Sequence, residues 1–164
     1  RISDKFKLDD NREVLIGGYA DRIDSLGNGD IRVVDYKTGR SNLDISGVSS
    51  LFEGEKCYEK GNLLQTMIYS MVLHNTLKRN VKPALYYVRQ MTSEDYNPHI
   101  IDNIDTPRTS SNEVDYLSYA DEFEQMLREK LLELFNPDIP FVQCEEEQAD
   151  KACSHCDFKT ICRR

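Results

Sequence analysis

Two runs of β-forming residues separated by a turn signal constrain the fold of this chain more than any other segment. EVLIGGYADRID occupies residues 13–24 and DIRVVDY occupies residues 30–36. Between them SLGNGD, at residues 25–30, has the Gly/Asn/Asp composition of a tight hairpin connection. The sequence therefore predicts two adjacent antiparallel strands.

The second of these strands carries opposite charges on one face. In VVDYKTG (residues 33–39), Asp35 and Lys37 project to one side while Val34 and Tyr36 project to the other. The charged side faces either solvent or a reaction site. The first alternative is an exposed Asp/Lys pair on an edge strand, which is worth at most about 1 kcal/mol.

The predicted hairpin brings another carboxylate toward this face. It sets Asp21 near Asp35, so that two carboxylates and the ammonium of Lys37 converge. Neighbouring carboxylates repel each other unless a divalent cation neutralises them, and magnesium prefers oxygen ligands. An ammonium beside the metal can orient a water or stabilise negative charge on a phosphoryl group. The combination favours metal-assisted hydrolysis of a phosphodiester.

The remaining chain predicts helices and further strands. Apolar residues at helical spacing predict an amphipathic helix over residues 58–77 and a longer helix that ends at Asn136. Ser110 and Glu113 have capping-box spacing and predict the start of that second helix. A strand is expected at 83–91.

The order of these elements predicts the fold class. A further strand is expected at 99–104, and residues 40–56 are expected to form a loop with a short helix. The fold is therefore expected to be α/β, with a small mixed central sheet flanked by helices. A chain of 164 residues fits a single domain.

Composition limits the possible functions. The net charge of -8 argues against nucleic-acid binding by bulk charge, although it leaves room for a local basic groove. No apolar stretch approaches the roughly 20 residues of a membrane span and no signal peptide is recognisable, so a cytoplasmic protein is expected. Because the sequence begins at Arg1 and a strand-like segment follows at once, it is expected to be a piece of a longer chain.

A cysteine cluster lies near the C-terminus, in CSHCDFKTIC. Cys153, Cys156 and Cys162 are more typical of metal ligands than of disulfides in a chain without a secretory signal. Thiolates select zinc or iron–sulfur clusters, and a closed site needs a fourth ligand. Cys144 and His155 are the local candidates for a zinc site, and free reduced thiols are the alternative.

Three ordered motifs resemble a known family. GYADRID, VVDYKTG and QTMIY, within residues 17–69, resemble the RecB-like branch of the PD-(D/E)XK nuclease superfamily, which implies a restriction-endonuclease-like core. In this resemblance Arg22 and Asp24 are supporting residues. The resemblance implies that Asp21, Asp35 and the main-chain carbonyl of Tyr36 are metal ligands and that Lys37 is the catalytic lysine. It also implies that Gln65 and Tyr69 form an accessory pair in the active site.

The resemblance also implies a function. Residues 1–164 would form a DNA exonuclease domain of a repair or recombination protein, using Mg²⁺ or Mn²⁺ and joined to a helicase domain or a partner subunit. The alternative is a non-catalytic nuclease-like domain that binds DNA ends or braces such a complex. The family usually supplies a further His or Glu ligand from a helix before these strands, so the site in this chain is expected to be incomplete.

The cysteine-rich tail, residues 144–164, has a resemblance of its own. It is similar to the AddB-like cluster of some of these nucleases, in which a fourth cysteine precedes the nuclease core. This resemblance implies a 4Fe–4S cluster in the full-length protein, with zinc as the alternative.

Overall fold

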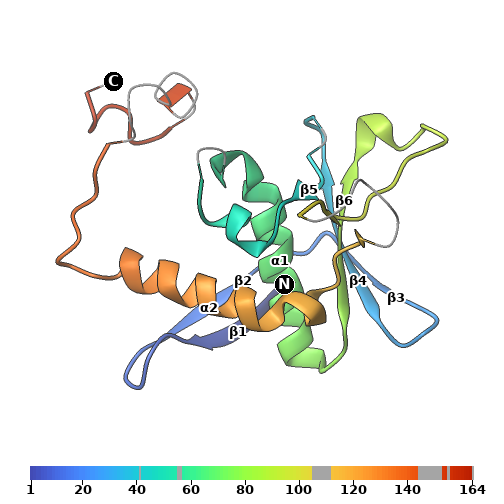
Figure 1. Cartoon of the computed structure of the whole chain (residues 1–164), viewed down its shortest axis with the longest axis horizontal. Coiled ribbons are helices and arrows are strands. Elements are labelled where there is room, and N and C mark those ends of the chain that lie inside the picture. The colour runs from blue at the N-terminus through green and yellow to red at the C-terminus, as the bar shows by residue number, and fades with distance from the viewer. Residues whose placement is uncertain (41, 55–56, 105–111, 144–152, 155, 164) are drawn as a thin grey trace. The chain divides into compact units, whose positions relative to one another are not determined.

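The computed structural model describes residues 1–40, 42–54, 57–104, 112–143, 153–154 and 156–163. They form two compact units, Arg1–Leu131 and Leu132–Arg164. The elements in the described residues, most of them labelled in Figure 1, are β1 (Ile2–Lys7), β2 (Glu13–Gly18), β3 (Arg22–Ser25), β4 (Ile31–Lys37), β5 (Asp44–Ile45), α1 (Gly61–Leu77), β6 (Val81–Tyr87), β7 (Ile101–Asp102) and α2 (Tyr116–Leu134), with short 3-10 helices at Val48–Leu51, Cys57–Lys60 and Val88–Gln90.

The predicted first strand is two strands. β2 pairs antiparallel with β1, and β3 pairs antiparallel with β4, so the chain changes partner between Gly18 and Arg22. The β1–β2 connection is closed by Asp9, whose Oδ1 accepts the main-chain N–H groups of Asn11 and Arg12, each at 2.9 Å. The prediction of one uninterrupted strand over residues 13–24 was therefore wrong, because residues 19–21 connect two strands that belong to separate ladders.

The predicted hairpin is confirmed in β3 and β4. Its turn is closed by hydrogen bonds between Leu26 and Asp30 and between Gly29 and Leu26, with Gly29 at φ 93°, a conformation that favours glycine. β4 also pairs in parallel with β6, giving the sheet order β3-β4-β6. Because β4 is the central strand, the interpretation of Asp35 and Lys37 as an exposed pair on an edge strand is wrong.

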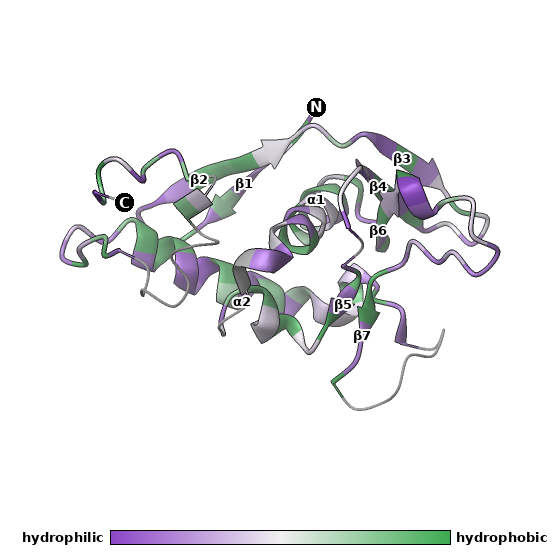
Figure 2. Cartoon of the chain, turned by 90° about the horizontal axis from the view of Figure 1, so that it is seen from above, coloured by the Kyte–Doolittle hydropathy of each residue, from purple (hydrophilic) through white to green (hydrophobic). Residues whose placement is uncertain are grey.

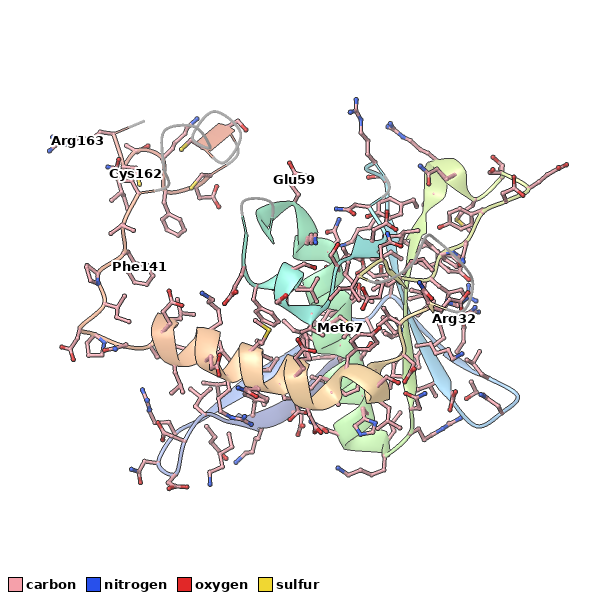
Figure 3. All side chains as sticks on the ribbon, viewed as in Figure 1. Arg32, Glu59, Met67, Phe141, Cys162 and Arg163 are labelled. Atoms are coloured by element: carbon pink, nitrogen blue, oxygen red, sulfur yellow. The ribbon has the colours of Figure 1, made fainter. Side chains whose placement is uncertain are left out.

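Helix α1 is the parallel crossover between β4 and β6, and it is more deeply buried than predicted. It packs against β6, β1, β2 and β4 (Figure 2). Met67, labelled in Figure 3, is fully buried, and so are the hydroxyl-bearing Thr66 and Ser70. These hydroxyls donate to main-chain carbonyls one turn earlier, which satisfies them inside the core. The expected single apolar face was too narrow a description.

Helix α2 begins later than its predicted capping box. Asp115 precedes it and accepts hydrogen bonds from the N–H and the hydroxyl of Ser118, at 3.1 and 2.9 Å, so Asp115 is the cap. Glu113 instead bridges to Ile101, and Ser110 lies outside the described residues. Phe123 is fully buried against Phe52, which fixes the helix on the core.

The other predicted strands are shorter than expected. β6 ends at Tyr87 and a 3-10 helix follows, so the strand predicted to reach residue 91 was too long. Of residues 99–104, Ile101 and Asp102 form β7, parallel to the two-residue β5 in the segment expected to be a loop. The short helix expected in that segment is the 3-10 helix Val48–Leu51. No helix in the described part of the chain is long and apolar enough to cross a bilayer.

The second unit contains the three clustered cysteines of CSHCDFKTIC. Cys153, Cys156 and Cys162 are each half-buried. The side chain of Gln143 donates to the carbonyl of Cys162 at 2.9 Å, which ties Gln143 to the last described residues of this unit. Cys144 and His155 lie outside the described residues.

Candidate active site

Asp35 is a buried carboxylate on the α1 side of the central strand. The residue is only 4% exposed, so the charged side of β4 does not face open solvent. The ammonium of Lys37 lies 2.6 Å from its Oδ2 and forms an ion pair with it, and no other described residue donates a hydrogen bond to Oδ2. A buried carboxylate needs a compensating cation, and among the described residues Lys37 supplies that charge.

Lys37 is held by a chain of polar contacts from α1. Its Nζ donates to Oε1 of Gln65 at 3.0 Å, and Nε2 of Gln65 donates to the hydroxyl of Tyr69 at 3.0 Å. The pair lies four residues apart on α1, as the sequence predicted, and reaches across to β4. The structure therefore links Asp35 to Lys37, Lys37 to Gln65 and Gln65 to Tyr69 in one chain of contacts.

Asp21 reaches β4 from the bend between β2 and β3. Its Oδ2 accepts the main-chain N–H of Tyr36 at 2.9 Å. Asp21 therefore lies beside the peptide that joins Asp35 to Tyr36, which agrees with the predicted approach of Asp21 to Asp35. No described residue donates to its other oxygen, Oδ1.

These groups fit a hard divalent cation. The donors in this neighbourhood are two carboxylates and the carbonyl of Tyr36, all oxygen ligands of the kind that Mg²⁺ selects. The buried carboxylate of Asp35, which among the described residues is compensated by the single charge of Lys37, is the side chain that such an ion would bind. Among the described residues no three His, Cys, Asp or Glu side chains gather as a complete metal site. The candidate donor set is thus two side chains and one main-chain group.

Gly18 is a site residue that the sequence reasoning missed. A Cβ at Gly18 would lie 2.6 Å from the hydroxyl oxygen of Tyr69 and 2.9 Å from its ring, so the missing side chain makes room for the tyrosine. Tyr69 is 7% exposed and has little space into which to move. The Gly-Gly pair inside the strand predicted over residues 13–24 was the available signal, because glycine in a strand often marks a close approach.

Replacing Gly18 by alanine is expected to lower the free energy of unfolding by about 1–3 kcal/mol, since the added methyl overpacks the Tyr69 contact. Urea denaturation measures this loss. Gly27→Ala is the matched control, because a Cβ at Gly27 meets nothing within 4 Å. In a Tyr69→Leu background, which removes both the hydroxyl and the ring, the cost of Gly18→Ala should shrink, and an undiminished cost would show that Tyr69 is not the group displaced.

The opposite face of β4 carries a charged and aromatic network. Arg22 donates to both carboxylate oxygens of Asp24 at 2.7 and 2.8 Å, and Arg32 reaches the same carboxylate at 2.8 Å. The hydrogen bonds from Arg22 hold the pKa of Asp24 below its usual range, so this carboxylate is ionised at neutral pH. Arg22 and Arg32 also lie over the ring of Tyr86.

A small sheet that joins an antiparallel hairpin to a parallel strand, with helices packed around it, is a restriction-endonuclease-like fold. The family model of the PD-(D/E)XK nuclease superfamily matches residues 2–163, and the chain belongs to this superfamily. The fold and family together make it a nuclease-like domain, and nucleases of this superfamily typically use divalent metals such as Mg²⁺. Comparison with curated proteins and with solved structures gave no match.

Proposed function

We propose that this chain is a RecB-like DNA nuclease domain that hydrolyses phosphodiester bonds with Mg²⁺ or Mn²⁺, acts as an exonuclease, and works in repair or recombination with a helicase domain or partner subunit. The observation that carries the catalytic part is the buried ion pair of Asp35 and Lys37 beside Asp21 and the Tyr36 peptide. A buried ion pair contributes little net stability, so a scaffold domain has little need of one at this position. The exonuclease and repair assignments follow from the three ordered motifs.

Each residue of the site has a separate task. Asp21, Asp35 and the carbonyl of Tyr36 would hold the ion, which when bound supplies an activated water and neutralises phosphate charge. Lys37 presents its ammonium to the negative charge that grows on the scissile phosphate. Gln65, itself held by Tyr69, accepts a hydrogen bond from Lys37 and keeps the ammonium directed at the site.

The full-length protein is expected to release nucleotides from linear DNA when Mg²⁺ is present and to stop when EDTA removes the metal. A covalently closed circle of the same sequence is the matched substrate, because an exonuclease requires an end and should leave the circle intact. Cleavage of both substrates would replace the exonuclease assignment by an endonuclease. Binding of linear DNA ends with no hydrolysis in Mg²⁺ or Mn²⁺ would favour the non-catalytic domain instead.

We also propose that the cysteine-rich tail, residues 144–164, binds a 4Fe–4S cluster in the full-length protein. The support is the spacing of Cys153, Cys156 and Cys162; the described residues do not gather as a metal site, so no further geometry follows. Anaerobically purified full-length protein is expected to show visible iron–sulfur absorbance that is lost in Cys156→Ser. Stoichiometric zinc in a colourless protein would contradict the cluster and establish the zinc alternative.

A further inference from the structure

The β3–β4 ladder stops beside the candidate metal ligands. The last main-chain pair is Arg22 opposite Val34, whereas β4 continues to Lys37 in its ladder with β6. Beyond Val34, the N–H of Tyr36 donates to the side chain of Asp21. A side-chain hydrogen bond therefore takes over where the main-chain ladder ends.

A second bond closes a ring around this point. Arg22, the residue after Asp21, donates from Nη1 to the hydroxyl of Tyr36 at 3.0 Å. Tyr36 therefore makes two hydrogen bonds to this segment: its N–H donates to Asp21, and its hydroxyl accepts from Arg22. Two stretches of covalent chain and two hydrogen bonds form a closed loop that limits rotation of the Asp21 carboxylate and of the Tyr36 peptide.

Arg22 is itself held in place, which makes it a well-positioned donor. Two of its nitrogens are engaged by the carboxylate of Asp24, and its guanidinium lies 5.7 Å from the centre of the Tyr86 ring. The ring of Tyr86 also meets that of Tyr36 edge to face, with 5.7 Å between centroids. The phenol of Tyr36 therefore binds a guanidinium fixed on two sides.

We propose that the Arg22–Tyr36 hydroxyl bond is a positioning clamp that makes the metal site selective for Mg²⁺ over Ca²⁺; this inference rests on the proposed function. Mg²⁺ demands near-ideal octahedral geometry, whereas Ca²⁺ accepts six to eight oxygens in flexible arrangements. A rigid Asp21 carboxylate and Tyr36 carbonyl favour the smaller ion. Loosening them penalises Mg²⁺ and leaves Ca²⁺ binding nearly unchanged. Arg22 and the Tyr36 hydroxyl act through the ligands and not on the substrate.

Calorimetric titration of the full-length protein with Mg²⁺ alone and with Ca²⁺ alone tests the clamp. Tyr36→Phe is expected to weaken Mg²⁺ binding about tenfold, the lower range for an outer-shell partner, with Ca²⁺ binding essentially unchanged. Tyr86→Phe is the matched control, because it removes a hydroxyl from the residue of β6 that faces Tyr36. The described residues provide no hydrogen-bond partner for this hydroxyl, so the variant should bind both ions as the wild type does.

A metal-free measurement separates the clamp from the proposed function. In the absence of divalent ions, hydrogen exchange at the residue-36 amide should be faster in Tyr36→Phe than in wild type and unchanged in Tyr86→Phe. Unchanged exchange, or equal weakening of Mg²⁺ and Ca²⁺ binding, would overturn the clamp while leaving the nuclease proposal in place. A wild-type protein that binds neither ion would overturn both.

Discussion

Alanine in place of Lys37 is expected to slow DNA hydrolysis by the full-length protein roughly 10³-fold at saturating Mg²⁺, because the substitution removes the positive charge beside the scissile phosphate. It also leaves the carboxylate of Asp35 buried without its ammonium partner. The free energy of unfolding in EDTA should therefore fall by about 1–3 kcal/mol. Rate assays with the folded fraction checked by circular dichroism separate the two effects.

Lys5→Ala is the matched control for this substitution. Lys5 pairs with Glu13 at 2.5 Å, similar to the Lys37–Asp35 separation, but both side chains are mostly exposed on the β1–β2 hairpin. Exposed pairs contribute little, so activity and stability should stay close to wild type. Hydrolysis at the wild-type rate by a folded Lys37→Ala protein would remove Lys37 from the catalytic set.

Asparagine in place of Asp35 is expected to abolish the stabilisation of the full-length protein by Mg²⁺. At a metal concentration of about 100 Kd, binding stabilises the wild type by about 2.7 kcal/mol, which corresponds to roughly 5–10 °C in Tm. The amide keeps the size of the carboxylate but loses its charge, so the fold is retained while the ion loses a ligand. Thermal scans in EDTA and in Mg²⁺ measure the shift, and DNA hydrolysis should disappear with it.

Asp10→Asn provides the comparison, because Asp10 is 96% exposed and pairs only with Lys7. It should retain the full Mg²⁺-dependent shift. If Asp35→Asn showed the same shift as Asp10→Asn, the ion would not be bound by Asp35, and the donor set built around that carboxylate would be wrong.

The sequence predicted those parts of the molecule that depend on local pattern. The SLGNGD turn and the alternation around Asp35 predicted the β3–β4 hairpin, and the four-residue spacing of Gln65 and Tyr69 predicted a shared helix face. The hairpin also predicted that Asp21 approaches Asp35, and the hydrogen bond from the N–H of Tyr36, the next residue, to Asp21 agrees with that prediction. The functional roles of these residues were inferred from chemistry and family resemblance, and remain proposals that the experiments above test.

The missed features depend on contacts between segments far apart in the chain. The alternation of residues 13–24 does not indicate that β1 pairs with the first half of this segment. The change of strand partner after Gly18 therefore could not be predicted from periodicity. The burial of Thr66 and Ser70 could not be predicted either. Their side chains are polar, and only the structure shows that each hydroxyl is hydrogen-bonded within its own helix and can therefore be buried. The contact between Gly18 and Tyr69 could be identified only once the positions of β2 and α1 were known.

The hydrogen bond from Arg128 of α2 to the carbonyl of Lys7 in β1 spans 121 residues of sequence. The guanidinium of Arg128 also lies over the ring of Phe6, so the first strand and the last helix of this unit are in direct contact. Such distant pairings form slowly, since a long loop must close before any contact rewards it. During synthesis on the ribosome, a nascent chain that has not yet emerged as far as Arg128 cannot make this contact, so the unit can close in this way only after nearly all of it has been translated.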